Sequence, residues 1–359
     1  MSRPRLFRGE IRRLNRQLTD CPRAATRGAP AKYMSLPKVF ITRPLPPPVI
    51  ERIATRCDVK VHPEDAPLEH ARLMEACREI EGLMTSGARV SQELLEHAPR
   101  LRVIANVGVG YDNIDVAACT RRRVLVTNTP DVLTETTADL AFALLMAVAR
   151  RVAESDRFVR EGRWRYWQWG YFWGADLFRK TLAVYGLGRI GKAVARRARG
   201  FSMRVLYCDI VRPSSALEQE LGVQFVDRET LLREADFLTL HVPLTPGTRH
   251  LISARELALL KPTAFLINTA RGQVVDEPAL VEALQSKQIA GAGLDVFEDE
   301  PHIHPALLGL PNVVLTPHVG SATSQTRLAM AMLAAENLLA ALEGRRPPNP
   351  VNPEIYTQE

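Results

Sequence analysis

The chain has 359 residues, 46% of them hydrophobic and 24% charged, which is typical of a globular protein with two domains. No run approaches the roughly 18 apolar residues of a transmembrane helix, so no membrane span is predicted. The five cysteines lie far apart, without a close pair of metal-binding or redox type, which favours reduced thiols, no metal site and a cytoplasmic protein.

The formal charge of +7 lies in the first 34 residues, which hold eight Arg and one Lys against Glu10 and Asp20. The rest of the chain is balanced, so we predict no nucleic-acid binding. We expect residues 1–36 to be a disordered, dispensable basic leader. A targeting peptide, or translated sequence upstream of a true start at Met34, is the alternative.

From Lys38, short β-branched runs alternate with charged amphipathic segments. The runs are "KVFIT", "VKVH", "EGLMTS", "LRVIANV" and "VLVTNT". This alternation predicts a parallel sheet with helices on both faces. A helix from about Thr136 to Gly162 is expected to follow as a connector.

The segment "WRYWQWGYFW", Trp164 to Trp173, holds all four tryptophans and seven of the 22 aromatic residues. It has neither helical nor strand periodicity, so it is predicted to be a loop. An exposed loop of this composition would be an association surface. A plug inside one domain is the alternative.

A second series of apolar runs predicts a second parallel sheet: "TLAVYG", "MRVLYCD", "ADFLTLHVP", "TAFLINTA", "AGAGLDVF" and "NVVLTPH". A last amphipathic helix, about Ser324 to Glu343, precedes a proline-rich extended tail. We expect this helix to pack on the first domain. The predicted domains are residues 37–138 with 324–359, and residues 139–323.

The first run of the second series ends in Gly186, Gly188 and Gly191, a helix follows, and the next run ends at Asp209. This is the complete dinucleotide-binding context, in which glycines admit a pyrophosphate to a helix amino end. Asp209 would accept hydrogen bonds from the adenosine ribose and repel a 2′-phosphate, which favours NAD. Arg212, three residues on, could pair with that phosphate, so NADP stays possible.

Three polar residues follow other strands of this series: Arg271, Glu300 and His318. Each alone has an ordinary interpretation as a surface arginine, a solvated acid or a capping histidine. Together, at strand ends behind a dinucleotide fingerprint, they indicate a catalytic site.

The sequence resembles the D-isomer-specific 2-hydroxyacid dehydrogenase family over about Lys38 to Pro353. The motifs are "NVGVGYDNID", "GLGRIG", "HVPLTPGTRHLI", "INTARGQVVDE", "GAGLDVFEDEP" and "NVVLTPHVGSAT". The resemblance implies two Rossmann-like α/β domains with doubly wound parallel sheets and an active-site cleft between them. It also implies a homodimer in which the aromatic loop is an arm on the partner subunit.

The resemblance assigns the substrate carboxylate and carbonyl to Arg271, acid/base chemistry to His318, and the partnering of that histidine to Glu300. It implies further cofactor contacts from Arg189, Ile190, His241, Pro243, Thr248, Thr269, Ala270, Asp295 and Gly320, besides Arg271 and His318. Backbone N–H groups around Val107 and Gly108 are expected to hold the substrate carboxylate.

Within the family, the glyoxylate/hydroxypyruvate reductases are the nearest resemblance, so the expected reaction is NAD(P)H-dependent reduction of a small 2-keto acid to the D-2-hydroxy acid. Phosphite dehydrogenase and a non-catalytic, NAD(H)-sensing, corepressor-like binding protein are the alternatives. Formate dehydrogenase is set aside, because Glu300 stands where that enzyme has glutamine.

Overall fold

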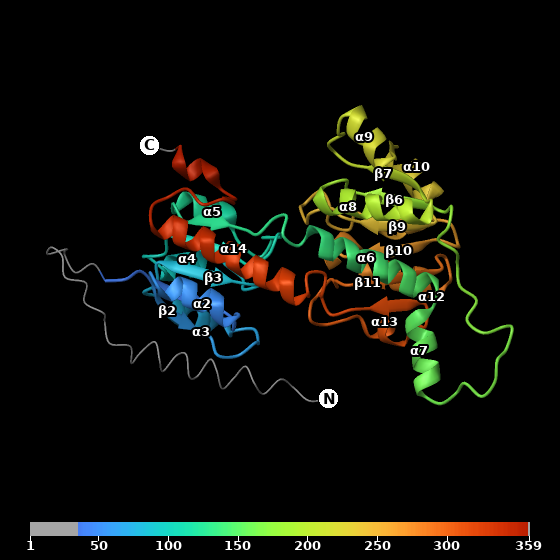
Figure 1. Ribbon diagram of the computed structural model, residues 1–359, viewed down its shortest axis with the longest axis horizontal. Coiled ribbons are helices and arrows are strands. Elements are labelled where there is room, and N and C mark those ends of the chain that lie inside the picture. The colour runs from blue at the N-terminus through green and yellow to red at the C-terminus, as the bar shows by residue number, and fades with distance from the viewer. Residues whose placement is uncertain (1–34, 358–359) are drawn as a thin grey trace. The chain divides into compact units, whose positions relative to one another are not determined.

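The chain folds into two α/β units (Figure 1). Within the described residues, unit 1 combines the chain up to Val132 with the segment from Ser324 onward, and unit 2 is Leu133–Thr323. The computed structural model describes residues 35–357, so the predicted leader, apart from its last two residues, lies outside the described residues. The boundary predicted at residues 138 and 139 falls inside a helix that belongs as a whole to unit 2.

Unit 1 is built on a five-stranded parallel sheet in the order β2-β1-β3-β4-β5. Its strands are β1 (Lys38–Ile41), β2 (Asp58–Val61), β3 (Gly82–Thr85), β4 (Val103–Asn106) and β5 (Leu125–Thr127). Its helices are α2 (Pro47–Ala54), α3 (His70–Cys77), α4 (Gln92–His97), α5 (Val116–Arg121), α14 (Ser324–Leu342) and the short η3 (Pro353–Tyr356). Strands β3, β4 and β5 are buried along their whole length, as expected of strands covered on both faces.

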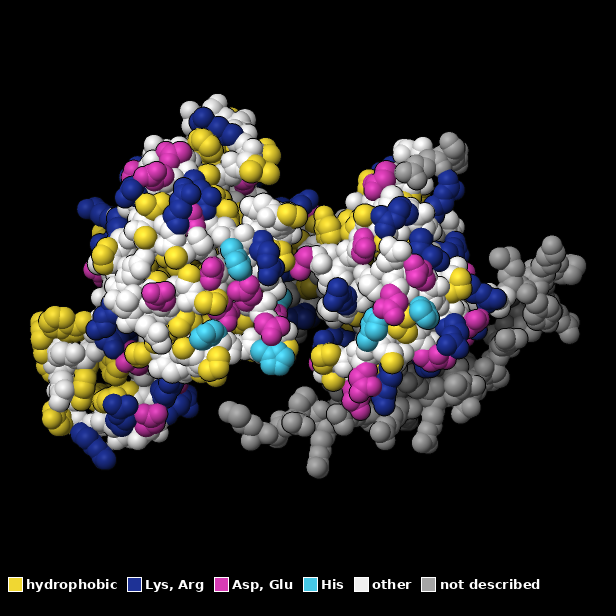
Figure 2. Space-filling view, turned by 180° about the vertical axis from the view of Figure 1, so that it is seen from behind, with side chains coloured by type: hydrophobic (Ala, Val, Ile, Leu, Met, Phe, Trp, Pro, Cys, Tyr) yellow, Lys and Arg dark blue, Asp and Glu magenta, His cyan; other side chains and the backbone are white. Residues whose placement is uncertain are grey.

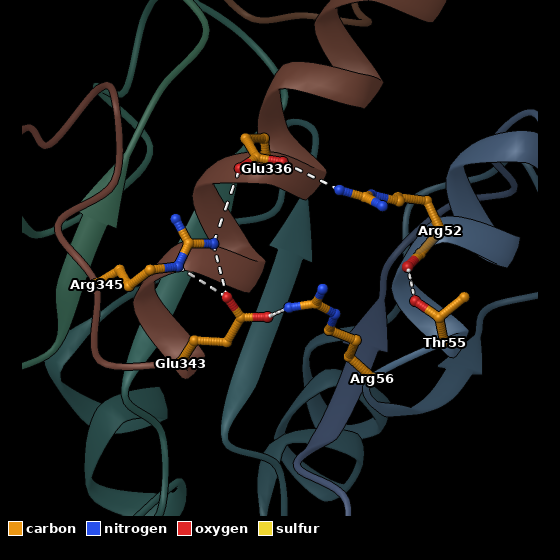
Figure 3. A network of polar contacts seen from close by, with 6 residues as sticks. All are labelled: Arg52, Thr55, Arg56, Glu336, Glu343 and Arg345. Atoms are coloured by element: carbon orange, nitrogen blue, oxygen red, sulfur yellow. Dashed lines mark hydrogen bonds and ion pairs between the residues drawn. The ribbon is translucent and has the colours of Figure 1, made fainter.

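Helix α14 returns from the end of the chain to pack on the sheet of unit 1. Its alanines 331, 334 and 335 and Leu338 are buried in one cluster with side chains of β1, β4 and α2. Figure 3 shows the ionic network at its edge, where Glu336 and Glu343 face Arg52 and Arg56 of α2 and its flank, together with Arg345. Exposed ion pairs contribute little stability, so the apolar face, rather than this network, holds the helix in place.

Unit 2 is built on a seven-stranded parallel sheet in the order β12-β11-β10-β9-β6-β7-β8. Its strands are β6 (Thr181–Tyr185), β7 (Arg204–Cys208), β8 (Val223–Phe225), β9 (Phe237–Leu240), β10 (Phe265–Asn268), β11 (Gly291–Leu294) and β12 (Val313–Leu315). Its helices are α6 (Thr134–Ala149), α7 (Val152–Arg160), α8 (Arg189–Ala198), η1 (Arg199–Phe201), α9 (Ser215–Leu221), α10 (Arg228–Glu234), α11 (Ala254–Leu257), η2 (Gly272–Val274), α12 (Glu277–Gln285) and α13 (Pro305–Gly309). The strand order reverses between β6 and β9, and doubly wound sheets bind ligands at such a point. The predicted fold class of two parallel-sheet α/β domains is confirmed.

The predicted connector helix is interrupted, so the single helix expected from about Thr136 to Gly162 is wrong. Arg151 adopts a left-handed conformation, φ 53° and ψ 36°, between α6 and α7. Its guanidinium donates to both carboxylate oxygens of Glu154, at 2.8 and 2.9 Å. The left-handed residue ends the first helix because it turns the chain out of the helical path.

The aromatic loop, Trp164 to Trp173, contains no helix or strand and joins α7 to β6 (Figure 1). Its four tryptophans are each between 57% and 76% exposed. Tyr171 and Phe172 instead pack edge-on against Phe158 of α7. Hydrophobic side chains gather at the corresponding place at the lower left of Figure 2. The tryptophans therefore do not plug the interior of their own chain.

No helix in residues 35–357 is long and apolar enough to cross a membrane. The four cysteines in this part of the chain, Cys57, Cys77, Cys119 and Cys208, are free thiols. Burial raises the pKa of Cys77 and Cys119 to about 12, so these two thiols stay protonated at neutral pH.

Candidate functional site

The predicted dinucleotide fingerprint forms a tight turn between β6 and α8. Gly186 has φ +92°, and a Cβ there would lie 2.7 Å from the His241 carbonyl oxygen. A Cβ on Gly191 would lie 2.1 Å from the Gly186 oxygen, so neither position admits a side chain. Gly188 is the N-cap of α8 and supplies no side-chain cap, while Arg189 and Ile190 begin the helix. The amino end of α8 therefore keeps backbone N–H groups that suit a pyrophosphate.

Asp209 follows β7 and is held rigidly by the backbone around it. Its Oδ2 accepts from the Leu187 N–H at 2.6 Å, and its Oδ1 accepts from the Val211 N–H at 3.1 Å. The carboxylate is thereby tied to the glycine turn, beside the fully exposed side chain of Ile210. Arg212, in the same loop, pairs with Glu218 of α9.

The segment after β9 carries three predicted cofactor residues. Desolvation lowers the pKa of His241 to about 3, so its ring is neutral, and Nε2 lies 2.8 Å from the Thr239 hydroxyl. Thr248 donates to the Pro243 carbonyl oxygen at 2.6 Å and accepts from the Thr245 N–H at 2.8 Å. These bonds fix the segment that follows β9. Strand β9 pairs with β6, which leads into the glycine turn.

The turn after β10 carries Thr269, Ala270 and Arg271. Asn268 braces it, because its side chain accepts from the Ala270 N–H at 3.0 Å and donates to the Arg271 oxygen at 2.8 Å. The Thr269 hydroxyl is buried without a hydrogen-bond partner among the described residues, and a bound ligand could supply one. Together with the glycine turn and the uncapped helix end, this orphaned hydroxyl fits a bound dinucleotide.

His318 and Glu300 are within hydrogen-bond distance of each other at the neighbouring strand ends. Nδ1 of His318 lies 2.8 Å from Oε2 of Glu300, and Oε1 of Glu300 accepts from the Phe297 N–H at 3.1 Å. Burial acts to raise the pKa of Glu300, but the hydrogen bond and charge of His318, with a smaller contribution from Arg271, lower it overall. The carboxylate is therefore charged at neutral pH and holds one ring nitrogen, leaving Nε2 for other chemistry.

The three residues predicted as catalytic follow adjacent strands. Arg271 follows β10, Glu300 lies in the segment after β11, and His318 follows β12, and these strands are neighbours in the sheet. The structure thus brings them to the same edge of unit 2, as the strand-end argument predicted.

Asp295 has a contact pattern that the sequence did not indicate. It is buried, and its carboxylate accepts from the Thr316 hydroxyl at 2.6 Å and from the N–H groups of Val319 and Gly320, each at 2.8 Å. Burial is the largest influence on its pKa and raises it. Predicted as a cofactor contact, Asp295 here braces the turn in which His318 adopts φ +53°.

The segment around Val107 and Gly108 lies in unit 1, after β4. The Val107 N–H already donates to the Thr85 carbonyl at 2.7 Å, so it is not a free donor. Asn106 braces the loop by donating to the oxygens of Gly108 and Gly110. Among the described residues, the N–H groups of Gly108 and Val109 have no backbone acceptor, so this loop can offer backbone donors to an anion.

Sequence reasoning missed three residues that shape this edge. Asn268 and Thr316 brace the turns of Arg271 and His318. Gly272 lies against the Phe297 peptide, where a Cβ would come 1.8 Å from the carbonyl carbon. A polar residue at the end of an apolar run was the available signal for Asn268 and Thr316, whereas nothing local distinguishes Gly272 from a turn glycine.

Comparisons with known proteins agree with this geometry. Residues 142–320 match the family model described as D-isomer specific 2-hydroxyacid dehydrogenase, NAD binding domain. A glyoxylate reductase of Pyrococcus furiosus is 51% identical over 324 residues, which cover 89% of this chain and 96% of that protein.

Solved structures extend the likeness to the whole fold. A protein of known structure from Thermus thermophilus is 46% identical with a TM-score of 0.82, covering 88% of this chain and 99% of its own. An NADPH-dependent glyoxylate/hydroxypyruvate reductase from Sinorhizobium meliloti, solved with NADP and malonate, is 38% identical with a TM-score of 0.78, covering 88% and 97%. The chain therefore belongs to the D-isomer specific 2-hydroxyacid dehydrogenase family and is an NAD(P)-dependent enzyme.

Proposed function

We propose that this enzyme uses NADH to reduce a small 2-keto acid, glyoxylate to glycolate or hydroxypyruvate to D-glycerate, and that His318 donates the proton. The observation that carries the proposal is the 2.8 Å pair of His318 and Glu300 at the strand ends next to that of Arg271. The substrate class is further supported by the relatives at about 50% identity that are named glyoxylate reductase.

The nicotinamide, when bound, supplies the hydride. Negative charge then develops on the substrate carbonyl oxygen, and a protonated His318 can neutralise it from Nε2, because Nδ1 is held by Glu300. Glu300 stabilises the imidazolium by its charge. Arg271 can hold the substrate carboxylate with two parallel hydrogen bonds, which orients the carbonyl. Gly108 and Val109 of unit 1 offer backbone donors for the same kind of anion.

The test is turnover by the purified protein, followed by NADH absorbance, with glyoxylate, hydroxypyruvate and pyruvate as substrates and a substrate-free control. We expect glyoxylate or hydroxypyruvate to give the highest kcat/KM. A separate assay measures the reduction of NAD in the presence of phosphite. Activity in that assay, without reduction of any 2-keto acid, would contradict the proposal.

The preference for NADH rests on Asp209. Its carboxylate is fixed at the end of β7 by two backbone N–H groups. A 2′-phosphate bound there would be repelled by this negative charge, because the hydrogen bonds keep the carboxylate in place. Asp209→Ala should narrow the ratio of kcat/KM for NADH over NADPH by about tenfold, since removing a close like charge near the surface is worth roughly 1 to 4 kcal/mol. Equal use of both cofactors by the unmodified enzyme would contradict the preference.

We also propose that the enzyme is a homodimer that buries the aromatic loop. Four tryptophans with most of their surface exposed on one loop form the kind of patch that interfaces cover. Sedimentation velocity at micromolar concentration should give a dimer, and a monomer under these conditions would refute the proposal.

A further inference from the structure

The guanidinium of Arg212, three residues beyond Asp209, is paired with a carboxylate through one edge. Its Nε and Nη2 donate to Oε1 and Oε2 of Glu218, at 2.8 and 3.0 Å, in a bidentate pair. Its Cζ lies 5.1 Å from the centre of the Phe225 ring. The Nε–Nη2 edge of the guanidinium is therefore directed at Glu218 instead of at a phosphate, and one face of the group lies on an aromatic ring.

Glu218 is in turn held in place by a residue of the sheet. The Tyr207 hydroxyl of β7 donates to Oε1 of Glu218, and the Tyr207 ring is fully buried and packs edge-on against Phe225 at 5.4 Å. Burial, then the bond to Glu218, raises the pKa of Tyr207 to about 12, so this hydroxyl is a donor at all physiological pH values. The pKa of Glu218 is lowered, mainly by its hydrogen bond with Arg212, so the carboxylate remains charged.

We propose that Glu218 determines cofactor specificity by holding Arg212 in this closed pair, which denies the arginine to the 2′-phosphate of NADP. In dinucleotide-binding domains, an arginine near the acidic position accommodates that phosphate. Here Asp209, Arg212 and Glu218 together carry one net negative charge, and loss of Glu218 would leave a neutral set with a free guanidinium fork. The inference rests on the NADH preference proposed above and adds a residue that acts through Arg212 without touching the cofactor.

The experiment measures direct binding, so it does not depend on the substrate. NADH and NADPH are titrated by fluorescence into the unmodified enzyme, Glu218→Gln and the control Glu220→Gln, which makes the same charge change on the same helix away from Arg212. Glu218→Gln keeps an acceptor for Tyr207, and we expect it to tighten NADPH binding about tenfold while NADH binding changes less than about threefold. Glu220→Gln should change both affinities equally and by less than about threefold.

A double-mutant cycle isolates the role of Arg212. In an Arg212→Ala background, Glu218→Gln should give no gain in NADPH affinity. A gain that persists there, or one matched by Glu220→Gln, would overturn the inference. Tyr207→Phe, which removes the hydroxyl and keeps the ring, should give a smaller gain in NADPH affinity than Glu218→Gln.

The two proposals fail in different ways. If the unmodified enzyme binds NADH more tightly than NADPH and Glu218→Gln leaves the ratio unchanged, only the role of Glu218 is overturned. If the unmodified enzyme already prefers NADPH, the proposed NADH preference is overturned, and the specificity role of Glu218 with it.

Discussion

Two regions of unit 2 differ in how completely their side chains are satisfied within the chain. At the ends of β10 to β12, the turns of Arg271 and His318 are braced by side chains such as Asn268 and Asp295. The aromatic loop leaves its tryptophans exposed, and three of them contact one another: Trp173 donates to the Trp169 oxygen, and Trp167 packs edge-on against Trp169. The catalytic turns are braced from within the chain, and we infer that the aromatic loop is covered by something outside it.

The difference fits the roles proposed for the two regions. A proton donor has to be held within a fraction of an ångström of its working position, so its turn is hydrogen-bonded to buried groups. A loop that is covered by association gains its stability at the moment of binding, so its own chain need not bury it. Mutations at the strand ends should therefore change the reaction rate, whereas mutations in the aromatic loop should change assembly.

The largest expected effect is on rate, from His318→Asn. Asparagine tolerates the left-handed backbone of this position, so the variant should fold, but it cannot act as the general acid. We expect kcat/KM for 2-keto acid reduction to fall by about 10²- to 10⁴-fold, with NADH affinity nearly unchanged. The exposed His302, replaced by Asn in a control, should leave the rate unchanged. A loss of less than about threefold in His318→Asn would remove this residue from the chemistry.

The second prediction tests the loop through assembly. Replacing Trp167 and Trp169 by Ser should weaken the dimer by about 2 kcal/mol for each tryptophan, or roughly 30-fold each in Kd. Analytical ultracentrifugation across a dilution series measures this change. Leu308→Ser, an exposed apolar residue of α13, is the matched control and should leave the dimer intact. If the double variant dimerises as the unmodified enzyme does, the loop does not form the interface.

The third prediction concerns pH, through Glu300→Gln. Loss of the anionic partner should move the pH optimum of reduction downward, because the imidazolium of His318 loses its hydrogen-bonded carboxylate. An unchanged pH profile of kcat/KM would remove Glu300 from the mechanism.

The same variant makes a prediction for stability. The pKa of Glu300 is lowered in the fold, so its contribution is present above the ordinary glutamate pKa, near 4.3, and is lost as pH falls through the lowered value. The difference in Tm between the unmodified enzyme and Glu300→Gln should therefore shrink as pH falls below about 4. If the difference in Tm instead grows as the pH falls, the contact of Glu300 with His318 does not lower the pKa of Glu300.

The smallest effect is expected from Thr316→Val, which keeps the shape of the side chain and removes one of the bonds to Asp295. We expect a stability loss of about 1 kcal/mol and a fall of a few fold in kcat, because two backbone N–H groups still hold the carboxylate. Thermal melts and steady-state rates measure both. If kcat does not change at all, Asp295 braces the turn without helping to position His318.

Sequence patterns were sufficient to predict the two sheets, the glycine turn and the grouping of Arg271, Glu300 and His318 at strand ends. Buried parallel strands have to be apolar along their whole length, and polar residues at their carboxyl ends then meet at one edge. Both signals are local in the chain, so they can be read without knowing which segments touch. The break at Arg151 was missed because no proline or glycine marks it.

The choice of hydrogen-bond partners was decided only by the tertiary structure. Asp295 lies against the turn of Thr316 and Gly320, Arg212 meets Glu218, and the Val107 N–H is taken by Thr85. Each of these pairs joins separate elements, and the sequence records the donors and acceptors but not the distances between loops. A buried carboxylate or an arginine fork accepts several partners equally well in chemical terms, so packing alone selects the one that is made.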